Sequence, residues 1–165
     1  MKIESTSFKG SFKIVKGSFD LVQVDIVNFF TKRAMVFYRG GTLEIKPKNF
    51  WGRKFDIIKN HNKIGQIIIK IKGTILLSLI SEKEVEHESY IIKPLGFWKN
   101  RFQLLDEEES LFFTLKAKWI WRKFQYDLLI EDLNERIEYD DLIDLLIFSA
   151  FGANVYLAMR SSGGS

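Results

Sequence analysis

The feature that most constrains the fold is an almost wholly apolar run near the C-terminus, residues 142–159, which reads LIDLLIFSAFGANVYLAM. Asp140 and Asp141 before this run favour the start of a helix, and Arg160 suits its end, because carboxylates stabilise the N-terminal end of a helix dipole and cations the C-terminal end. A helix that is apolar on every side must be surrounded by protein or by lipid. We therefore expect a buried helix at about 141–160.

The chain before this helix predicts an all-β structure. Short stretches in which apolar and polar residues alternate follow one another from about residue 2 to residue 132, with turn residues such as Gly17-Ser18 and Gly40-Gly41 between them. Phenylalanine, which packs well on pleated surfaces, occurs 15 times. The expected strands are 2–8, 11–16, 19–27, 34–39, 42–47, 54–60, 63–72, 74–82, 88–94, 102–106, 110–118 and 124–132.

About a dozen strands that close into a barrel leave an interior that their own side chains do not fill. A closed barrel with a central helix is one way to occupy that space. We therefore predict a single domain, residues 1–160, in which a closed antiparallel β-barrel encloses the apolar C-terminal helix, with a flexible Ser/Gly tail at 161–165. The alternative is a tail-anchored membrane protein that uses 142–159 as its span. These 18 residues come close to the length of about 20 that a membrane span needs.

An internal repeat links two of the expected hairpins. Residues 45–58 align without a gap onto residues 92–105, an offset of 47 residues. Each copy has an Ile-Lys-Pro segment followed by a W-x-x-[KR]-F turn, and a shorter echo at 119–124 again ends with phenylalanine entering a strand. Proline cannot donate a ladder hydrogen bond, so the proline of each copy marks a strand end. The repeat indicates that a unit of about four strands was copied.

Basic residues and all four tryptophans gather in the three repeated turns. Tryptophan beside Lys or Arg is typical of a membrane interface, where the indole ring sits at headgroup depth and each cation contributes about 1 kcal/mol near an anionic surface. We therefore expect these turns to bind anionic membrane lipid or phosphoinositide-like headgroups. The candidate ligand-binding residues are Lys46, Lys48, Trp51, Arg53, Lys54, Lys93, Trp98, Lys99, Arg101, Trp119, Trp121, Arg122 and Lys123.

Two other interpretations of the turns stay open. Each tryptophan can seal a hairpin by packing across the strand, with basic neighbours that keep the edge soluble. The same groups can also stack on single-stranded nucleic acid. The net charge of +4 is small and acidic and basic residues are interspersed, so nucleic acid is not the expected partner.

Nothing in the sequence favours catalysis, and we expect a non-enzymatic protein without cofactor or metal. Cysteine is absent, which excludes disulfides and thiolate metal sites. No phosphate-binding glycine loop, nucleophile elbow or zinc spacing occurs. His61 and His87 lie in polar contexts that predict surface positions, and the acidic stretches 82–88 and 106–109 are expected to be solvated loops.

The order of about a dozen strands followed by one apolar helix, together with the W-x-x-[KR]-F turns, resembles the tubby-like superfamily. This superfamily includes the tubby C-terminal domain, the LURP-one-related proteins and the phospholipid scramblases. The resemblance covers nearly the whole chain and implies the barrel fold with a bias toward membrane-lipid binding or scaffolding. The family's phosphoinositide-binding, calcium-binding and palmitoylation motifs match no positions here, and the absence of cysteine counts directly against palmitoylation.

Three functions remain to be compared. The first is a barrel module that binds anionic lipid, the second is an intracellular interaction or scaffold protein with a protein partner of unknown identity, and the third is the tail-anchored protein. The N-terminus lacks the continuous apolar core of a signal peptide, so we expect a location in the cytoplasm or at the periphery of a membrane.

Overall fold

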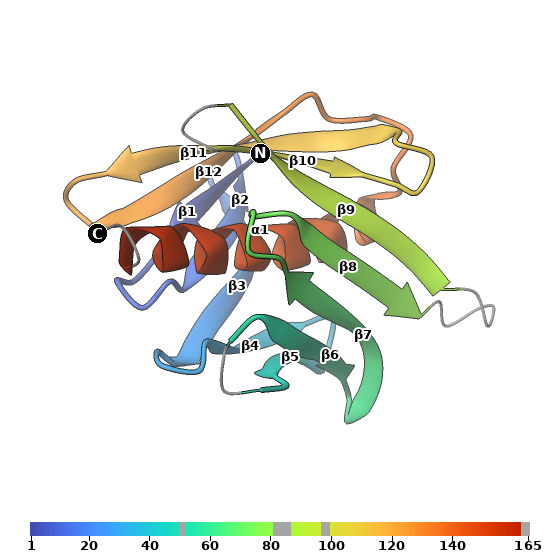
Figure 1. Ribbon diagram of the computed structural model, residues 1–165, viewed down its shortest axis with the longest axis horizontal. Coiled ribbons are helices and arrows are strands. Elements are labelled where there is room, and N and C mark those ends of the chain that lie inside the picture. Colours follow the sequence, from blue (N-terminus) through green and yellow to red (C-terminus); the bar gives the residue numbers. More distant parts are fainter. Residues whose placement is uncertain (50–51, 81–86, 97–99, 163–165) are drawn as a thin grey trace.

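The computed structural model of the protein describes residues 1–49, 52–80, 87–96 and 100–162. Within these residues, twelve antiparallel strands pair in the order of the chain, and β12 pairs with β1 to close a barrel around a single helix, α1 (Figure 1). The fold is therefore the predicted closed antiparallel β-barrel with a central C-terminal helix. The elements are β1 Lys2–Ser5, β2 Phe12–Lys16, β3 Phe19–Asn28, β4 Arg33–Tyr38, β5 Gly41–Pro47, β6 Lys54–Lys59, β7 Asn62–Ile69, β8 Ile75–Ile80, β9 His87–Leu95, β10 Arg101–Leu105, β11 Leu111–Ile120, β12 Gln125–Glu131 and α1 Tyr139–Ser162.

The element boundaries differ from the predicted ones by a few residues. The first strand ends at Ser5 rather than at residue 8, because a turn begins at Thr6, whose N–H donates to the carbonyl of Ser11 at 2.8 Å. The helix starts at Tyr139 and continues to Ser162, so residues 161 and 162 are helical rather than part of a flexible tail. Residues 163–165 of that predicted tail lie outside the described residues.

Alternate side chains of the strands point toward the helix, as β11 shows. Phe113, Leu115 and Ala117 are buried, while Lys118 on the opposite face is exposed. This is the alternation that the sequence predicts for a strand with one buried face. The inner faces of the other strands are likewise rich in Ile, Val, Leu and Phe.

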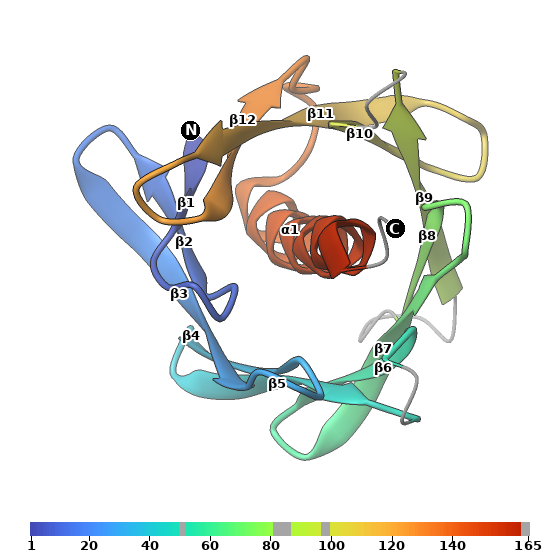
Figure 2. The ribbon, with the colours of Figure 1, turned by 60° about the vertical axis from the view of Figure 1, so that its left-hand side comes forward.

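The helix fills the barrel, and Figure 2 shows it enclosed when the barrel is viewed end-on. Phe151 packs edge-on against Phe55 of β6 with ring centroids 5.0 Å apart, and Tyr156 packs against Phe102 of β10 at 6.1 Å. The buried apolar side chains of α1 are Leu142, Ile143, Leu145, Leu146, Ile147, Phe148, Ala150, Phe151, Ala153, Val155, Tyr156 and Leu157. They lie on every side of the helix, so α1 has no polar face along this stretch.

The length and composition of α1 would also suit a membrane span. Its mean hydropathy reaches 1.8 over the most apolar 18-residue window, and 78% of that window is buried inside the barrel. A tail anchor would therefore require the barrel to release the helix that fills it. This exchange is costly because it would expose the apolar inner faces of the strands to water.

The repeat coincides with two hairpins four strands apart. Pro47 at the end of β5 pairs with Phe55 of β6, and Pro94 of β9 pairs with Phe102 of β10, so the two copies have the same register. Both phenylalanines are fully buried. The echo is different: Phe124 lies in the turn before β12 with a φ of 50° and is 70% exposed, so the prediction that it enters a strand is wrong.

Two glycines allow the helix to approach the barrel wall. A Cβ atom at Gly152 of α1 would lie 3.1 Å from Cγ2 of Ile75 in β8. In the β7–β8 turn, Gly73 has a φ of 96°, and a Cβ atom there would overlap the ring of Tyr156. The turn therefore rests directly on the C-terminal part of the helix.

Removing α1 should prevent the barrel from folding. A chain that ends at Glu138 lacks ten large buried side chains of the helix. At about 1.5–3 kcal/mol each, their burial exceeds the roughly 5–15 kcal/mol by which domains of this size are usually stable. We expect circular dichroism and proteolysis to report an unfolded chain. A soluble, cooperatively folding product would instead support the tail-anchor alternative.

Gly73→Ala should destabilise the protein more than the matched substitution Gly17→Ala. Both positions have positive φ, so both variants pay the roughly 1–2 kcal/mol cost of a left-handed backbone. Only the Gly73 variant also places a methyl group against Tyr156, which should cost about 1–3 kcal/mol more in the free energy of unfolding. Urea denaturation measures both values, and equal losses would show that the turn does not depend on the helix contact.

Candidate functional site

The turns of the barrel alternate between its two ends because neighbouring strands are antiparallel and follow one another along the chain. The six turns that follow the odd-numbered strands share one end with the C-terminal end of α1, at the left of Figure 1 and facing the viewer in Figure 2. We call this end the basic rim. Its described residues are 6–11, 29–32, 48–49, 52–53, 70–74, 96, 100 and 121–124.

The basic rim carries cations without acidic neighbours in its turns. Eight of its described residues are Lys or Arg, and none of its described residues is Asp or Glu. Turns of one charge sign create a local field that attracts partners of the opposite sign. The eight residues are Lys9, Lys32, Lys48, Arg53, Lys70, Lys72, Arg122 and Lys123.

The opposite end of the barrel has the opposite charge. We call it the acidic rim, and its described residues are 17–18, 39–40, 60–61, 106–110 and 132–138. Seven of these residues are acidic, and two, Arg39 and Arg136, are basic. The small net charge of the chain therefore conceals a strong separation of charge along the barrel axis. The acidic residues are Asp106, Glu107, Glu108, Glu109, Asp132, Glu135 and Glu138.

Large apolar side chains are also exposed on the basic rim. Phe30 is 92% exposed and Trp121 is 77% exposed. Single exposed apolar residues are ordinary, but groups of them mark interaction surfaces. Six exposed residues of this kind belong to the turns of the basic rim, namely Phe8, Phe29, Phe30, Ile71, Trp121 and Phe124.

Five of the predicted ligand-binding cations are exposed on the basic rim or close to it. Lys48, Arg53 and Arg122 are exposed in turns of the basic rim and form no ion pair with a described residue. Lys54 is exposed where β6 starts, and Lys46 is exposed on the outer wall near the end of β5. These five cations are available to an anionic partner.

Three other predicted cations already have partners. Lys93 lies on the outer wall in β9 and pairs with Glu109 at 2.6 Å, and its ammonium group lowers the pKa of that carboxyl. Arg101 in β10 pairs with Glu131 at 3.1 Å. Lys123 donates to the carbonyl oxygen of Ser5 at 2.9 Å, which ties the β11–β12 turn to β1.

The described tryptophans divide between structure and surface. Trp119 is half-buried and packs on Tyr126, with ring centroids 4.9 Å apart, so it seals the hairpin as one of the alternatives predicts. Trp121 stands edge-on to it at 6.0 Å and remains largely exposed. The predicted residues Trp51, Trp98 and Lys99 lie outside the described residues.

A groove on the basic rim brings four cations together. It has a volume of about 490 Å³ and lies between the β5–β6 and β7–β8 turns. Ile69 N–H donates to the carbonyl of Arg53 at 2.7 Å, and this hydrogen bond holds the two walls together. No acidic residue lines the groove among the described residues, and its basic residues are Arg53, Lys54, Lys70 and Lys72.

Three of the six turns of the basic rim contain none of the predicted binding residues. The turns between β1 and β2, β3 and β4, and β7 and β8 contain the same mixture of cations and apolar residues, but they are not copies of the repeat. A signal was available, because every second turn of an up-and-down barrel lies at the same end. Comparing the charges of alternate turns would have separated the two rims.

The described residues contain no candidate metal centre. No group of three or more His, Asp or Glu side chains is placed to hold a metal ion in that part of the chain. Asp106 instead organises its own turn, because its Oδ1 accepts hydrogen bonds from the N–H groups of Glu108 at 3.0 Å and Ser110 at 2.7 Å. His61 is exposed in a turn, as predicted, while most of the acidic stretch 82–88 lies outside the described residues.

Comparison with known proteins finds no matching family model, no matching curated protein and no matching solved structure.

The mouth of the barrel at the acidic rim contains a partly buried carboxyl group, Asp144 of α1. Burial raises the pKa of Asp144 above its ordinary value of 3.8, although the nearby cations Arg39 and Lys59 oppose this shift. A carboxyl whose pKa is raised on folding stabilises the protein while it is protonated, and this contribution is lost as the pH rises through the folded-state pKa. The ionised form is therefore unfavourable at neutral pH.

Asp144→Asn should accordingly raise the free energy of unfolding at pH 7. The gain should disappear as the pH falls below 3.8, because both side chains are then neutral. Asp141→Asn is the matched control, since Asp141 is exposed in the first turn of α1 and its negative charge there is favourable. Denaturation curves from pH 3 to pH 7 measure the effect, and a loss of stability in the Asp144 variant at pH 7 would contradict this account.

Proposed function

We propose that the protein is a non-enzymatic module that binds anionic membrane surfaces through its basic rim. The observation that carries this proposal is the separation of charge: the described turns of the basic rim contain eight cations, no carboxylate and six exposed large apolar side chains. Cations and aromatic rings together suit the lipid headgroup region, where each cation contributes about 1 kcal/mol.

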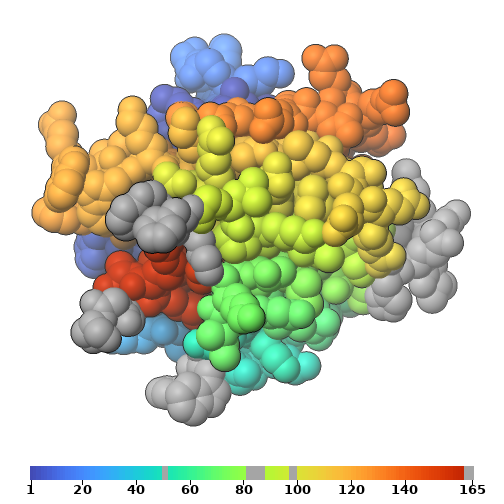
Figure 3. All heavy atoms as spheres, turned by 45° about the horizontal axis from the view of Figure 1, so that its top comes forward, coloured from blue at the N-terminus to red at the C-terminus, as the bar shows by residue number. Residues whose placement is uncertain are grey.

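The charge of the other end supports one orientation on the membrane. An anionic bilayer attracts the basic rim and repels the acidic rim. The barrel axis should therefore be roughly perpendicular to the membrane surface, with the C-terminal end of α1 toward the lipid. Figure 3 shows the red end of α1 at the surface beside the orange β11–β12 turn, while the strands cover the rest of the helix on this face. In this orientation the helix remains in the core and the turns contact lipid.

The groove between the β5–β6 and β7–β8 turns is the proposed site for a phosphorylated headgroup. The guanidinium group of Arg53 can donate two parallel hydrogen bonds to a phosphate group. Three lysines that line the same groove add positive charge. Ile71 beside the groove is 81% exposed and would contact the interfacial region of the lipid. A phosphoinositide-like headgroup has the charge density that such a set of cations favours.

We further propose that the chain is related to the tubby-like superfamily. A twelve-stranded closed barrel around a C-terminal helix is the architecture expected from that resemblance and supports it. The proposed location is the cytoplasm, with reversible attachment to a membrane.

The direct test is cosedimentation with vesicles at low ionic strength, where charge attraction is least screened. The protein should pellet with vesicles that contain phosphatidylserine and remain in solution with phosphatidylcholine alone. The triple variant Lys48→Gln, Arg53→Gln and Arg122→Gln loses three unpaired cations of the basic rim. At about 1 kcal/mol for each cation, binding to anionic vesicles should weaken on the order of 100-fold.

A second triple variant, Lys13→Gln, Lys63→Gln and Lys116→Gln, provides the control. It loses the same net charge from the outer wall, where each of these lysines is within 4 Å of a carboxylate. Its vesicle binding should stay close to that of the unmodified protein. Equal weakening of both variants, or no pelleting with anionic vesicles at low salt, would refute the proposal and favour the protein-interaction alternative.

A further inference from the structure

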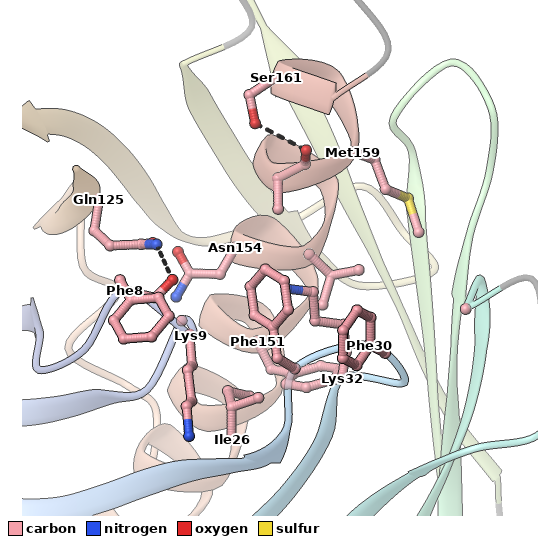
Figure 4. A pocket seen from close by; sticks show the side chains of 15 residues that line it. Phe8, Lys9, Ile26, Phe30, Lys32, Gln125, Phe151, Asn154, Met159 and Ser161 are labelled. Carbon is pink, nitrogen blue, oxygen red and sulfur yellow. Dashed lines mark hydrogen bonds between the residues drawn. The ribbon is translucent and has the colours of Figure 1, made fainter.

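A cavity opens at the basic rim between the last turns of α1 and the turns β1–β2 and β3–β4 (Figure 4). Its volume is about 450 Å³, which lies within the range of roughly 300–1,000 Å³ that small-molecule sites occupy. It is separate from the cationic groove, since the two share no lining residue in the part of the chain that the structure describes.

The floor of this cavity is mainly apolar, although Asn154 of α1 also lines the cavity. Ile26 of β3 and Phe151 and Val155 of α1 line it and are at most 6% exposed. Phe151 is held in place by its edge-on contact with Phe55. Ala158, farther along the helix, lines the opening with only a methyl group. A floor of this kind favours an alkyl chain, because contact with it removes apolar surface from water.

The mouth of the cavity carries positive charge. Lys9 and Lys32 line it, and no described lining residue is acidic. Lys32 is half-buried and forms no ion pair with a described residue, and burial alone lowers its pKa. Its ammonium group instead lies 3.9 Å from the ring centroid of Phe29. A partly desolvated cation without a carboxylate is a suitable position for the charged group of a ligand.

Exposed aromatic rings connect the cavity with the outer surface of the basic rim. The ring centroids of Phe8 and Phe29 are 6.5 Å apart, and those of Phe29 and Phe30 are 5.7 Å apart. The side chain of Asn28 fixes this turn, because its Oδ1 accepts hydrogen bonds from the N–H groups of Phe30 and Thr31, each at 3.0 Å. All three rings line the same cavity as the floor residues.

We propose that this cavity takes one acyl chain of an anionic lipid, with the chain on the apolar floor and the negative group beside Lys32. The inference rests on the proposed function for the source of the lipid, a bilayer in contact with the basic rim. It adds a specific single-chain site to an otherwise nonspecific attraction between charged surfaces.

Decanoate, a soluble single-chain carboxylate, tests the site without vesicles. Calorimetric titration of the full chain should show saturable binding of one decanoate. Decan-1-ol, which has the same chain without the charge, should bind roughly tenfold more weakly, because it lacks the charge-assisted contact with Lys32. Lys32→Gln should remove this preference, and this turn variant leaves the core intact.

Ala158→Leu should block the cavity and abolish decanoate binding, whereas the matched variant Ala158→Ser should bind decanoate as the unmodified protein does. Thermal unfolding checks that both variants fold. Both should still pellet with phosphatidylserine vesicles. The Lys48, Arg53 and Arg122 variant should instead bind these vesicles on the order of 100-fold more weakly and keep decanoate binding. The acyl-chain site and the membrane-binding function can therefore fail separately.

Several results would overturn the acyl-chain site. These are the absence of saturable decanoate binding by a protein that pellets with anionic vesicles, unchanged binding in Ala158→Leu, and equal affinity for decanoate and decan-1-ol. Self-association through the aromatic turns that decanoate does not displace would also refute it, because a second copy of the chain would then occupy the cavity mouth.

Discussion

Enclosure of an apolar helix is the constraint on which the rest of this structure depends. Residues 142–157 offer hardly any polar surface, so α1 is stable in water only when other parts of the chain surround it. Twelve strands form a barrel wide enough to do this, and their inward side chains fill the remaining space. Contacts such as Phe151 with Phe55 make the helix and the barrel parts of one core.

This enclosure also determines where function can reside. The interior is occupied by side chains, so the barrel does not provide the wide central cavity of a hollow barrel. Ligands must bind at the ends or on the outer wall, where the turns carry the most distinctive residues. Because the turns alternate between the two ends, the sequence can give each end its own charge without changing the strands that form the core.

The two proposed sites use different physics at the same end of the molecule. The groove beside Arg53 is lined by four cations in addition to isoleucine side chains, so long-range charge attraction dominates there. The cavity beside Lys32 is lined mainly by apolar groups and has its charge at the mouth. One attracts a headgroup from solution, and the other holds a chain once the surfaces are in contact.

The architecture could be predicted from local sequence patterns. Alternating strands, a helix with no polar face, and prolines at equivalent strand ends in the repeat predict the barrel, because these patterns depend on local geometry and on the need to bury apolar surface. Which side chains meet at the proposed site, and which are paired on the wall, depends on the three-dimensional structure. It placed the turns of Phe8, Lys32 and Arg122 at one end of the barrel. It also put Lys93 and Arg101 in ion pairs on the wall and left Phe124 in the turn before β12. Such proximity between distant turns depends on strand order and closure, which a local pattern does not contain.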